Sequence, residues 1–155
     1  MEKDIATDKK YTFWCGFITL KIKVAQTNAV LKVNTEMLTL YWEIGSSIIE
    51  KLALNGWGSK VIDLLAKDFA KNFPGNSGFS VRNLKYMRAF AEAYPYFPVV
   101  QVSLAQSHDQ FVQVPLAQIT WYYHINLLTK VKNTAERAFY ITETVQNEWS
   151  RVLCF

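Results

Sequence analysis

Apolar residues recur at three- and four-residue steps through much of this chain, the period of helices that bury one face. The first such run covers residues 11–54 and predicts a long amphipathic helical arm. Its apolar positions include Ile18, Ile22, Ala25, Ala29, Met37, Tyr41, Ile44 and Ile48. No proline interrupts the run, but Asn34-Thr35 offers an internal N-cap, so one long helix and two helices in tandem both fit. The polar residues 1–10 are expected to be flexible.

Residues 56–94 show the pattern of a helix, a turn and a second helix. Asn55-Gly56 supplies the left-handed residue that ends the arm, and Trp57 is expected to plug the joint between helices. Ser59 is the expected cap of the first helix. The buried stripe of that helix is Val61, Ile62, Leu65 and Phe69. The turn formers from Phe73 to Gly78 then stop it.

The second helix of this unit is the best specified element of the sequence. Ser80 is an N-cap, and Phe79 with Leu84 forms a hydrophobic staple around it. The inward positions are Leu84, Met87, Phe90, Ala91 and Tyr94. Three cations spaced three residues apart, Arg82, Lys85 and Arg88, fall on an outward strip. Pro95 and Pro98 prevent the helix from continuing.

Residues 99–118 contain an internal duplication, in which Val-Gln-Val and Leu-Ala-Gln occur twice at an offset of twelve residues. The segment fits a short β-hairpin resembling the wing of a winged helix, around residues 99–116. It fits equally well an extended segment followed by a short helix. Residues 120–153 return to a helical pattern, with Thr120 and Asn133 as caps of two helices. The expected inward stripes are Trp121, Ile125 and Leu128, then Ala138, Ile141, Val145 and Trp149.

These elements predict a single, mainly α, multi-helix domain with a helix-turn-helix-like core. A chain of 155 residues that is 50% hydrophobic can bury a core and is not disordered. No run is apolar for long enough to span a membrane, and the two cysteines lack a CxxC spacing, so a cytoplasmic protein is expected. The net charge of +4 is modest, so its placement along the chain matters more than its size.

No catalytic, metal-binding or cofactor-binding pattern is found in the sequence. His108 and His124 are the only histidines, and neither has a cysteine, serine or acidic partner at a motif spacing. His124, among aromatic residues at helical spacing, fits a satisfied, partly buried side chain better than a ligand. The glycines between Phe73 and Phe79 are not followed by Lys-Ser/Thr, so they do not form a phosphate-binding loop. The chain is not expected to be an enzyme.

Several motifs occur in a recognisable order. They are Tyr41-Trp42-Glu43-Ile44-Gly45, Gly56-Trp57-Gly58, Gly78-Phe79-Ser80 with Arg82-Asn83-Leu84 and Tyr86-Met87-Arg88, Leu116-Ala117-Gln118 with Trp121, and Trp149-Ser150. Together they resemble the N-terminal domain of YhcG-type bacterial proteins, which carry a PDDEXK nuclease domain further along. The resemblance covers roughly residues 21–153 and implies a helix-turn-helix-like DNA-binding domain, with a nuclease domain in cis or in trans. No Glu-x-Lys pair occurs in this chain, so these residues do not supply the nuclease site.

Two functional hypotheses follow. The first is DNA binding, in which the cations neutralise phosphates and Arg82 and Asn83 contact base edges. The expected contact residues are Ser80, Arg82, Asn83, Lys85, Tyr86, Arg88 and Lys60. The alternative is a protein-interaction or homo-oligomerisation domain that uses the apolar surface of the N-terminal arm. The turn before the second helix is longer than that of common helix-turn-helix motifs, which counts against standard docking on DNA.

Overall fold

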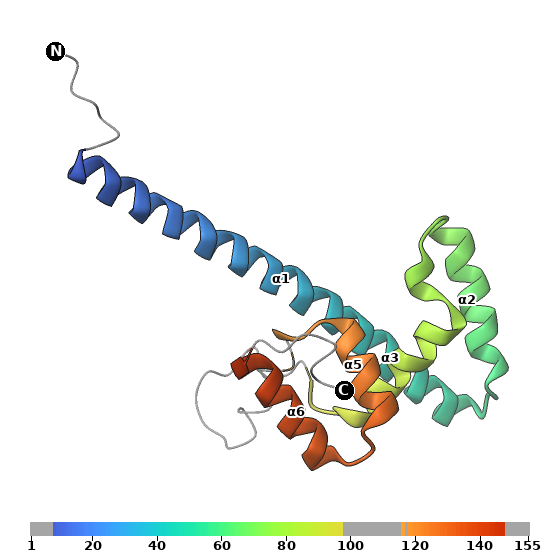
Figure 1. Cartoon of the computed structure of the whole chain (residues 1–155). Coiled ribbons are helices and arrows are strands. Elements are labelled where there is room, and N and C mark those ends of the chain that lie inside the picture. The colour runs from blue at the N-terminus through green and yellow to red at the C-terminus, as the bar shows by residue number, and fades with distance from the viewer. Residues whose placement is uncertain (1–7, 98–115, 117, 148–155) are drawn as a thin grey trace. The chain divides into compact units, whose positions relative to one another are not determined.

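The computed structural model describes residues 8–97, 116 and 118–147, and every regular element within these residues is a helix (Figure 1). The expected mainly α, multi-helix fold is therefore confirmed. The hairpin expected around residues 99–116 lies outside the described residues apart from Leu116, as does the helical start expected at Trp149. The chain divides into two compact units, residues 1–33 and residues 34–155.

Helix α1 runs from Lys9 to Asn55 as one element of 47 residues, which decides between the two alternatives for the arm. Asn34, the candidate internal cap, donates its side-chain amide to the carbonyl oxygen of Ile119 at 2.9 Å. Its side chain serves this tertiary contact, and the helix continues past it. The helix ends where expected, because Gly56 has a φ of 61°, which glycine adopts without steric cost.

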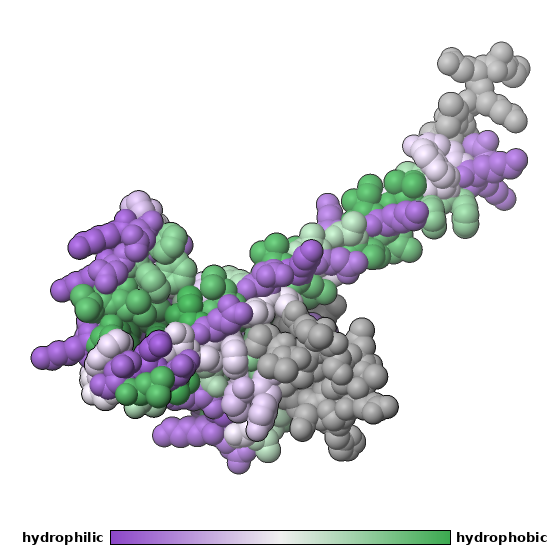
Figure 2. Space-filling model, turned by 180° about the vertical axis from the view of Figure 1, so that it is seen from behind, coloured by the Kyte–Doolittle hydropathy of each residue, from purple (hydrophilic) through white to green (hydrophobic). Residues whose placement is uncertain are grey.

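Residues 9–33 of α1, which belong to the first unit, expose nearly all of their side chains. The large apolar ones that are at least half exposed include Phe13, Trp14, Phe17, Leu20, Ile22 and Val24. Figure 2 shows apolar groups along this helix with hydrophilic groups between them. No helix in the described part of the chain combines the length and the apolar character needed to cross a membrane.

Helix α2 (Lys60–Asn72) packs the expected stripe against the core: Ile62 is 1% exposed, and Val61, Leu65 and Phe69 are partly buried. Two expectations at its start are wrong. Ser59 forms no side-chain cap, because its own backbone is already helical at φ −58° and ψ −18°. Trp57 is 50% exposed and therefore does not plug the joint. The glycines on either side of Trp57 allow the chain to turn without burying the ring.

Helix α3 (Val81–Ala93) follows a connection over residues 73–80 that contains the short 3-10 helix η2 (Ser77–Phe79). The expected cap is confirmed, since the Ser80 hydroxyl accepts from the Asn83 amide at 3.3 Å. The two staple residues, Phe79 and Leu84, pack in the same cluster. The inward stripe is also confirmed, as its five residues are all buried.

Helices α5 (Trp121–Lys130) and α6 (Thr134–Asn147) complete the described elements. Thr120 makes no side-chain cap, whereas the Asn133 side chain accepts from the amides of Ala135 and Glu136 as predicted. The deepest positions of α5 are His124 and Leu127, one residue before two of the expected inward positions, Ile125 and Leu128. The expected stripe of α6 is confirmed at Ile141, which is 1% exposed.

The second half of α1 crosses α3 at Gly45. A Cβ atom at Gly45 would lie 2.1 Å from the carbonyl oxygen of Met87, so the two backbones are in direct contact. One turn before this crossing, the Trp42 indole nitrogen donates to the carbonyl oxygen of Tyr94 at 2.7 Å, which satisfies the end of α3. This crossing fixes α3, and with it the direction in which its outer face points.

Candidate nucleic-acid interface

The outer face of α3 carries the three cations predicted from the sequence. Arg82 and Lys85 are exposed, and the Arg88 side chain is 41% exposed. Because they are spaced three residues apart, their side chains lie along one side of the helix. Glu92 is the single carboxylate of α3. The strip formed by Arg82, Lys85 and Arg88 is therefore a cationic surface open to solvent.

Arg82 at the start of this strip lies over the ring of Tyr86. The guanidinium carbon is 5.7 Å from the ring centroid, and one of its nitrogens donates to the hydroxyl at 3.5 Å. The side-chain hydrogen bond with Arg82 is the main cause that lowers the pKa of Tyr86. A side-chain hydrogen bond with Thr129 of α5 lowers it further. A guanidinium held against an aromatic face loses less side-chain freedom when it binds a planar acceptor.

Arg88 at the other end forms an ion pair with Glu92 at 2.8 Å. Both side chains are nearly half exposed, and pairs of this kind one turn apart on a helix contribute about 0.3–0.5 kcal/mol. The energy is small enough for a phosphate to take the place of Glu92. Sequence reasoning missed Glu92, although its position four residues after Arg88 is the signal for such a pair.

Asn83, which was expected to contact a base, has both ends of its side-chain amide engaged within the protein. Its nitrogen donates to the carbonyl oxygen of Gly78, and its oxygen accepts from the Trp121 indole nitrogen at 2.8 Å. The side chain thereby connects the turn before α3 with the first residue of α5. These contacts hold the Asn83 side chain in place within the fold.

We expect Asn83→Ala to lower the free energy of unfolding by about 2 kcal/mol, because it leaves the Trp121 indole nitrogen and the Gly78 carbonyl without their partners. Chemical denaturation measures this loss. If the outer face of α3 binds DNA, the affinity of the folded fraction should stay within about threefold of the wild-type value, a far smaller change than the loss of a bidentate base contact would cause. A large drop in affinity with unchanged stability would restore Asn83 to the contact surface.

The remaining predicted contact residues lie at helix starts. Ser80 is engaged as the cap of α3, and the amides of Val81 and Arg82 behind it have no hydrogen-bond partner among the described residues. Such amides attract anions at a helix N-terminus. Lys60 is the exposed first residue of α2, so it lies on a different helix from the cationic strip.

His124 is fully buried, deeper than the partly buried position expected for it. Its Nε2 donates to the carbonyl oxygen of Leu116 at 2.9 Å, and the ring packs edge-on against Phe90 and Tyr94. Burial is the main cause that lowers the pKa of His124 to about 4, so the ring is neutral at pH 7. Within the described residues, no three of the side chains His, Cys, Asp and Glu gather into a cluster suited to a metal ion.

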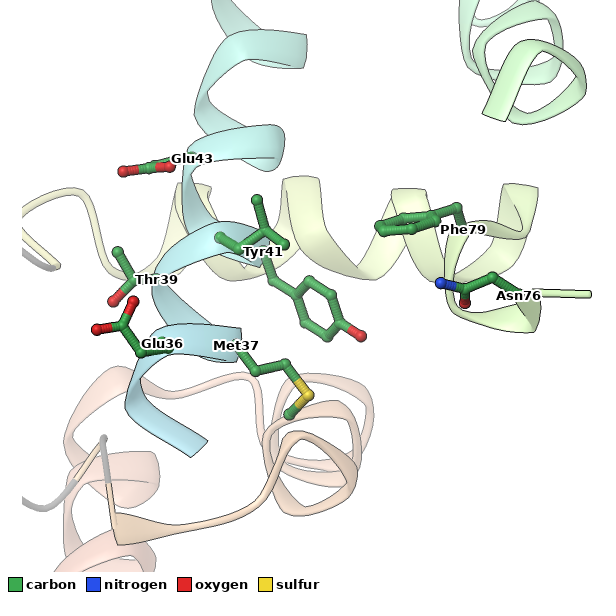
Figure 3. Close-up of a pocket in the computed structure, with 8 residues that line it drawn as sticks. Glu36, Met37, Thr39, Tyr41, Glu43, Asn76 and Phe79 are labelled. Atoms are coloured by element: carbon green, nitrogen blue, oxygen red, sulfur yellow. The ribbon is translucent and has the colours of Figure 1, made fainter. Parts of the chain in front are cut away.

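A second surface feature is a hollow of about 570 Å³ beside the second half of α1 (Figure 3). Its apolar lining comes from Met37, Leu40 and Phe79, and its acidic lining from Glu36 and Glu43. Burial raises the pKa of Tyr41, the aromatic residue of the lining whose ring packs on Trp121 with centroids 4.9 Å apart. The hollow therefore combines an apolar floor with negative charge.

These features define a mainly α, multi-helix domain with a cationic strip on one exposed helix. The chain matches the DUF1016 N-terminal domain over residues 18–153, and it belongs to that family. The resemblance to the N-terminal domain of YhcG-type proteins is thereby confirmed. Comparison with curated proteins and with solved structures found no match.

Proposed function

We propose that this domain binds DNA through the outer face of α3. The observation that carries the proposal is the strip of Arg82, Lys85 and Arg88, which is open to solvent on a helix that contains a single carboxylate, Glu92. Cations in such a row neutralise phosphates and release counterions, which makes the affinity depend on salt. The first-turn amides of Val81 and Arg82, for which the described residues supply no partner, add donors for a phosphate at the same end of the helix.

In this proposal α2, the connection over residues 73–80 and α3 act as a helix-turn-helix-like unit. Two features support it: α2 and α3 share an apolar cluster, and the crossing at Gly45 holds α3 against α1. Arg82, held over the Tyr86 ring, is the residue best placed to read a guanine edge or to grip a phosphate in a fixed orientation. The domain then serves as a DNA-holding module for a nuclease domain of the family, in cis or in trans.

A triple alanine variant of Arg82, Lys85 and Arg88 tests the proposal. Alanine keeps the helix propensity of α3, so the fold is expected to persist. We expect duplex affinity at 50 mM salt to fall at least tenfold, and the slope of log affinity against log salt to become shallower by about 0.9 for each phosphate that the variant no longer neutralises. Fluorescence anisotropy with duplex, branched and single-stranded DNA at several salt concentrations measures both quantities.

The matched control replaces Lys9, Lys23 and Lys51 with alanine, which removes the same charge from exposed positions of α1. This variant should keep the salt slope and most of the affinity. If both variants were weakened equally, net charge and not the α3 strip would account for binding. If the wild-type domain bound none of the three DNA forms, the DNA-binding proposal would be rejected.

The alternative, a protein-interaction domain, is favoured by a different observation. The exposed apolar side chains on residues 9–33 are more numerous than a helix facing only water requires. The two roles use different surfaces and are compatible, since many DNA-binding domains act as dimers.

A further inference from the structure

Charge is unevenly distributed along α1. Residues 9–33 contain the five lysines Lys9, Lys10, Lys21, Lys23 and Lys32 and no acidic residue. Residues 34–55 contain the three glutamates Glu36, Glu43 and Glu50 and one lysine, Lys51. The first half of the helix is therefore basic and the second half is acidic.

The basic half also carries the exposed apolar side chains. Lys10, Lys21 and Lys32 recur at eleven-residue steps, a spacing that follows a nearly straight line along a helix. Apolar rows flank this line on both sides, Phe13, Phe17, Leu20 and Val24 on one side and Trp14, Ile18, Ala25 and Ala29 on the other. The Lys21 ammonium lies 4.8 Å from the centroid of the Phe17 ring, so lysine stems and apolar groups form one surface.

The acidic half presents a matching surface away from the core. Its exposed residues recur at alternating steps of four and three residues: Glu36, Leu40, Glu43, Ser47, Glu50 and Leu54. The hollow floored by Met37, Leu40 and Phe79 opens beside the same row, with Glu36 and Glu43 among its lining residues (Figure 3). This face offers negative charge around an apolar recess, the complement of the basic half.

We propose that two copies of the chain associate with their α1 helices antiparallel, so that the basic half of each lies on the acidic face of the other. A two-fold arrangement forms this contact twice with the same residues. With the α1 helices overlapping end to end, Lys21 of one copy then faces Glu43 of the other and Lys10 lies one turn from Glu50. Val24 lies opposite Leu40, at the partner's hollow. This antiparallel dimer goes beyond the DNA-binding proposal and does not depend on it.

Other arrangements fit the surface less well. A parallel pair would set the lysines of one copy against those of the other, which is repulsive. A helix lying on a lipid surface needs its apolar residues on one face, whereas here apolar rows flank both sides of the lysine line. An antiparallel second copy matches both the charge and the apolar rows with residues that the chain itself supplies.

Charge exchange tests the proposal directly. We expect the wild-type protein to be a dimer at tens of micromolar in low salt. The variants K10E/K21E/K32E and E36K/E43K/E50K should each weaken the dimer at least tenfold, because each sets like charges face to face. The variant with all six changes should dimerise again, and so should an equimolar mixture of the two triple variants. Analytical ultracentrifugation measures the masses.

The mixture also guards against misfolding, since two unfolded variants would not combine into a dimer of native helix content. As a matched control, K60E/K67E/K71E reverses three exposed lysines of α2 and should leave the dimer intact. The triple alanine variant of α3 should also remain dimeric, which separates this proposal from the DNA-binding one. The proposal of an antiparallel dimer would be overturned if the wild-type protein were monomeric, or if the variant with all six substitutions stayed monomeric.

Cys15, which is exposed on the basic half of α1, provides a separate test of the relative orientation of the two α1 helices. In an antiparallel pair whose α1 helices overlap end to end, the two Cys15 residues lie about 50 Å apart at 1.5 Å per residue, too far for a disulfide. In a parallel pair they are adjacent. With Cys154→Ser as the background, mild oxidation should therefore leave the dimer without a covalent bond. Rapid and complete disulfide formation would indicate the parallel arrangement and contradict the proposal.

Discussion

Replacing Gly45 with alanine is expected to lower the free energy of unfolding by about 3 kcal/mol, at the upper end of the cost of overpacking a core. The added Cβ would lie 2.1 Å from the carbonyl oxygen of Met87 and 2.5 Å from its carbonyl carbon. Both are backbone atoms, so no side-chain rotation relieves the clash, and α1 must move away from α3. Urea unfolding followed by circular dichroism measures the loss.

Gly16 provides the matched control, because it lies on the same helix and an added Cβ would meet nothing within 4 Å beyond the adjoining backbone of that helix. Gly16→Ala gains helix propensity, about 1 kcal/mol for the local helix, and should not destabilise the rest of the fold. The two variants therefore change stability in opposite directions. If Gly45→Ala did not lower the free energy of unfolding, the direct backbone contact between α1 and α3 at Gly45 would be contradicted.

The second large effect is a loss of stability in mild acid caused by His124. Its pKa is lowered to about 4 in the folded protein, against 6.5 for an exposed histidine. Between these values the unfolded chain binds a proton that the folded protein excludes, so acidification favours unfolding. The His124 contribution is almost fully present at about pH 7.5, stability falls by about 2 kcal/mol by pH 5, and it has fallen by about 3 kcal/mol at pH 4.

Denaturation midpoints between pH 5 and pH 7 measure this slope. In His124→Gln, whose side-chain amide can still donate to the Leu116 carbonyl oxygen, the slope between pH 5 and pH 7 should largely disappear, whatever the change in absolute stability. His108→Gln is the control, since the chain contains only these two histidines, and it should keep the wild-type slope. A slope that followed His108 instead would show that His124 is not the group responsible.

The structure also explains several of the motifs that identify the family. In the first motif, Trp42 closes the end of α3 and Gly45 allows the helix crossing. In the motifs around α3 and α5, Asn83 and Trp121 hydrogen-bond to each other. These residues position the outer face of α3, on which Arg82 and Arg88 of the motifs are open to solvent together with Lys85.

Part of the candidate interface on α3 follows from residues that are close together in the sequence. The cap at Ser80, the staple around it and the three-residue spacing of the cations depend on residues within a few positions of one another. These local rules therefore predicted α3, its buried stripe and its cationic strip. The same rules failed at Ser59 and Trp57, because glycines beside Trp57 let the backbone take a course that local patterns do not specify.

The sequence by itself determined that this protein is a mainly helical domain, with the elements ending close to where caps, glycines and prolines place them. Only the tertiary structure decided that α1 is one helix, that Gly45 touches the backbone of α3, and that Asn83 is bonded to Trp121. Each of these depends on residues that are far apart in the chain: Asn34 and Ile119 are separated by 85 positions, and Asn83 and Trp121 by 38. Hydrophobic periodicity states which face of a helix is buried, but the partner of that face is chosen by packing the whole chain.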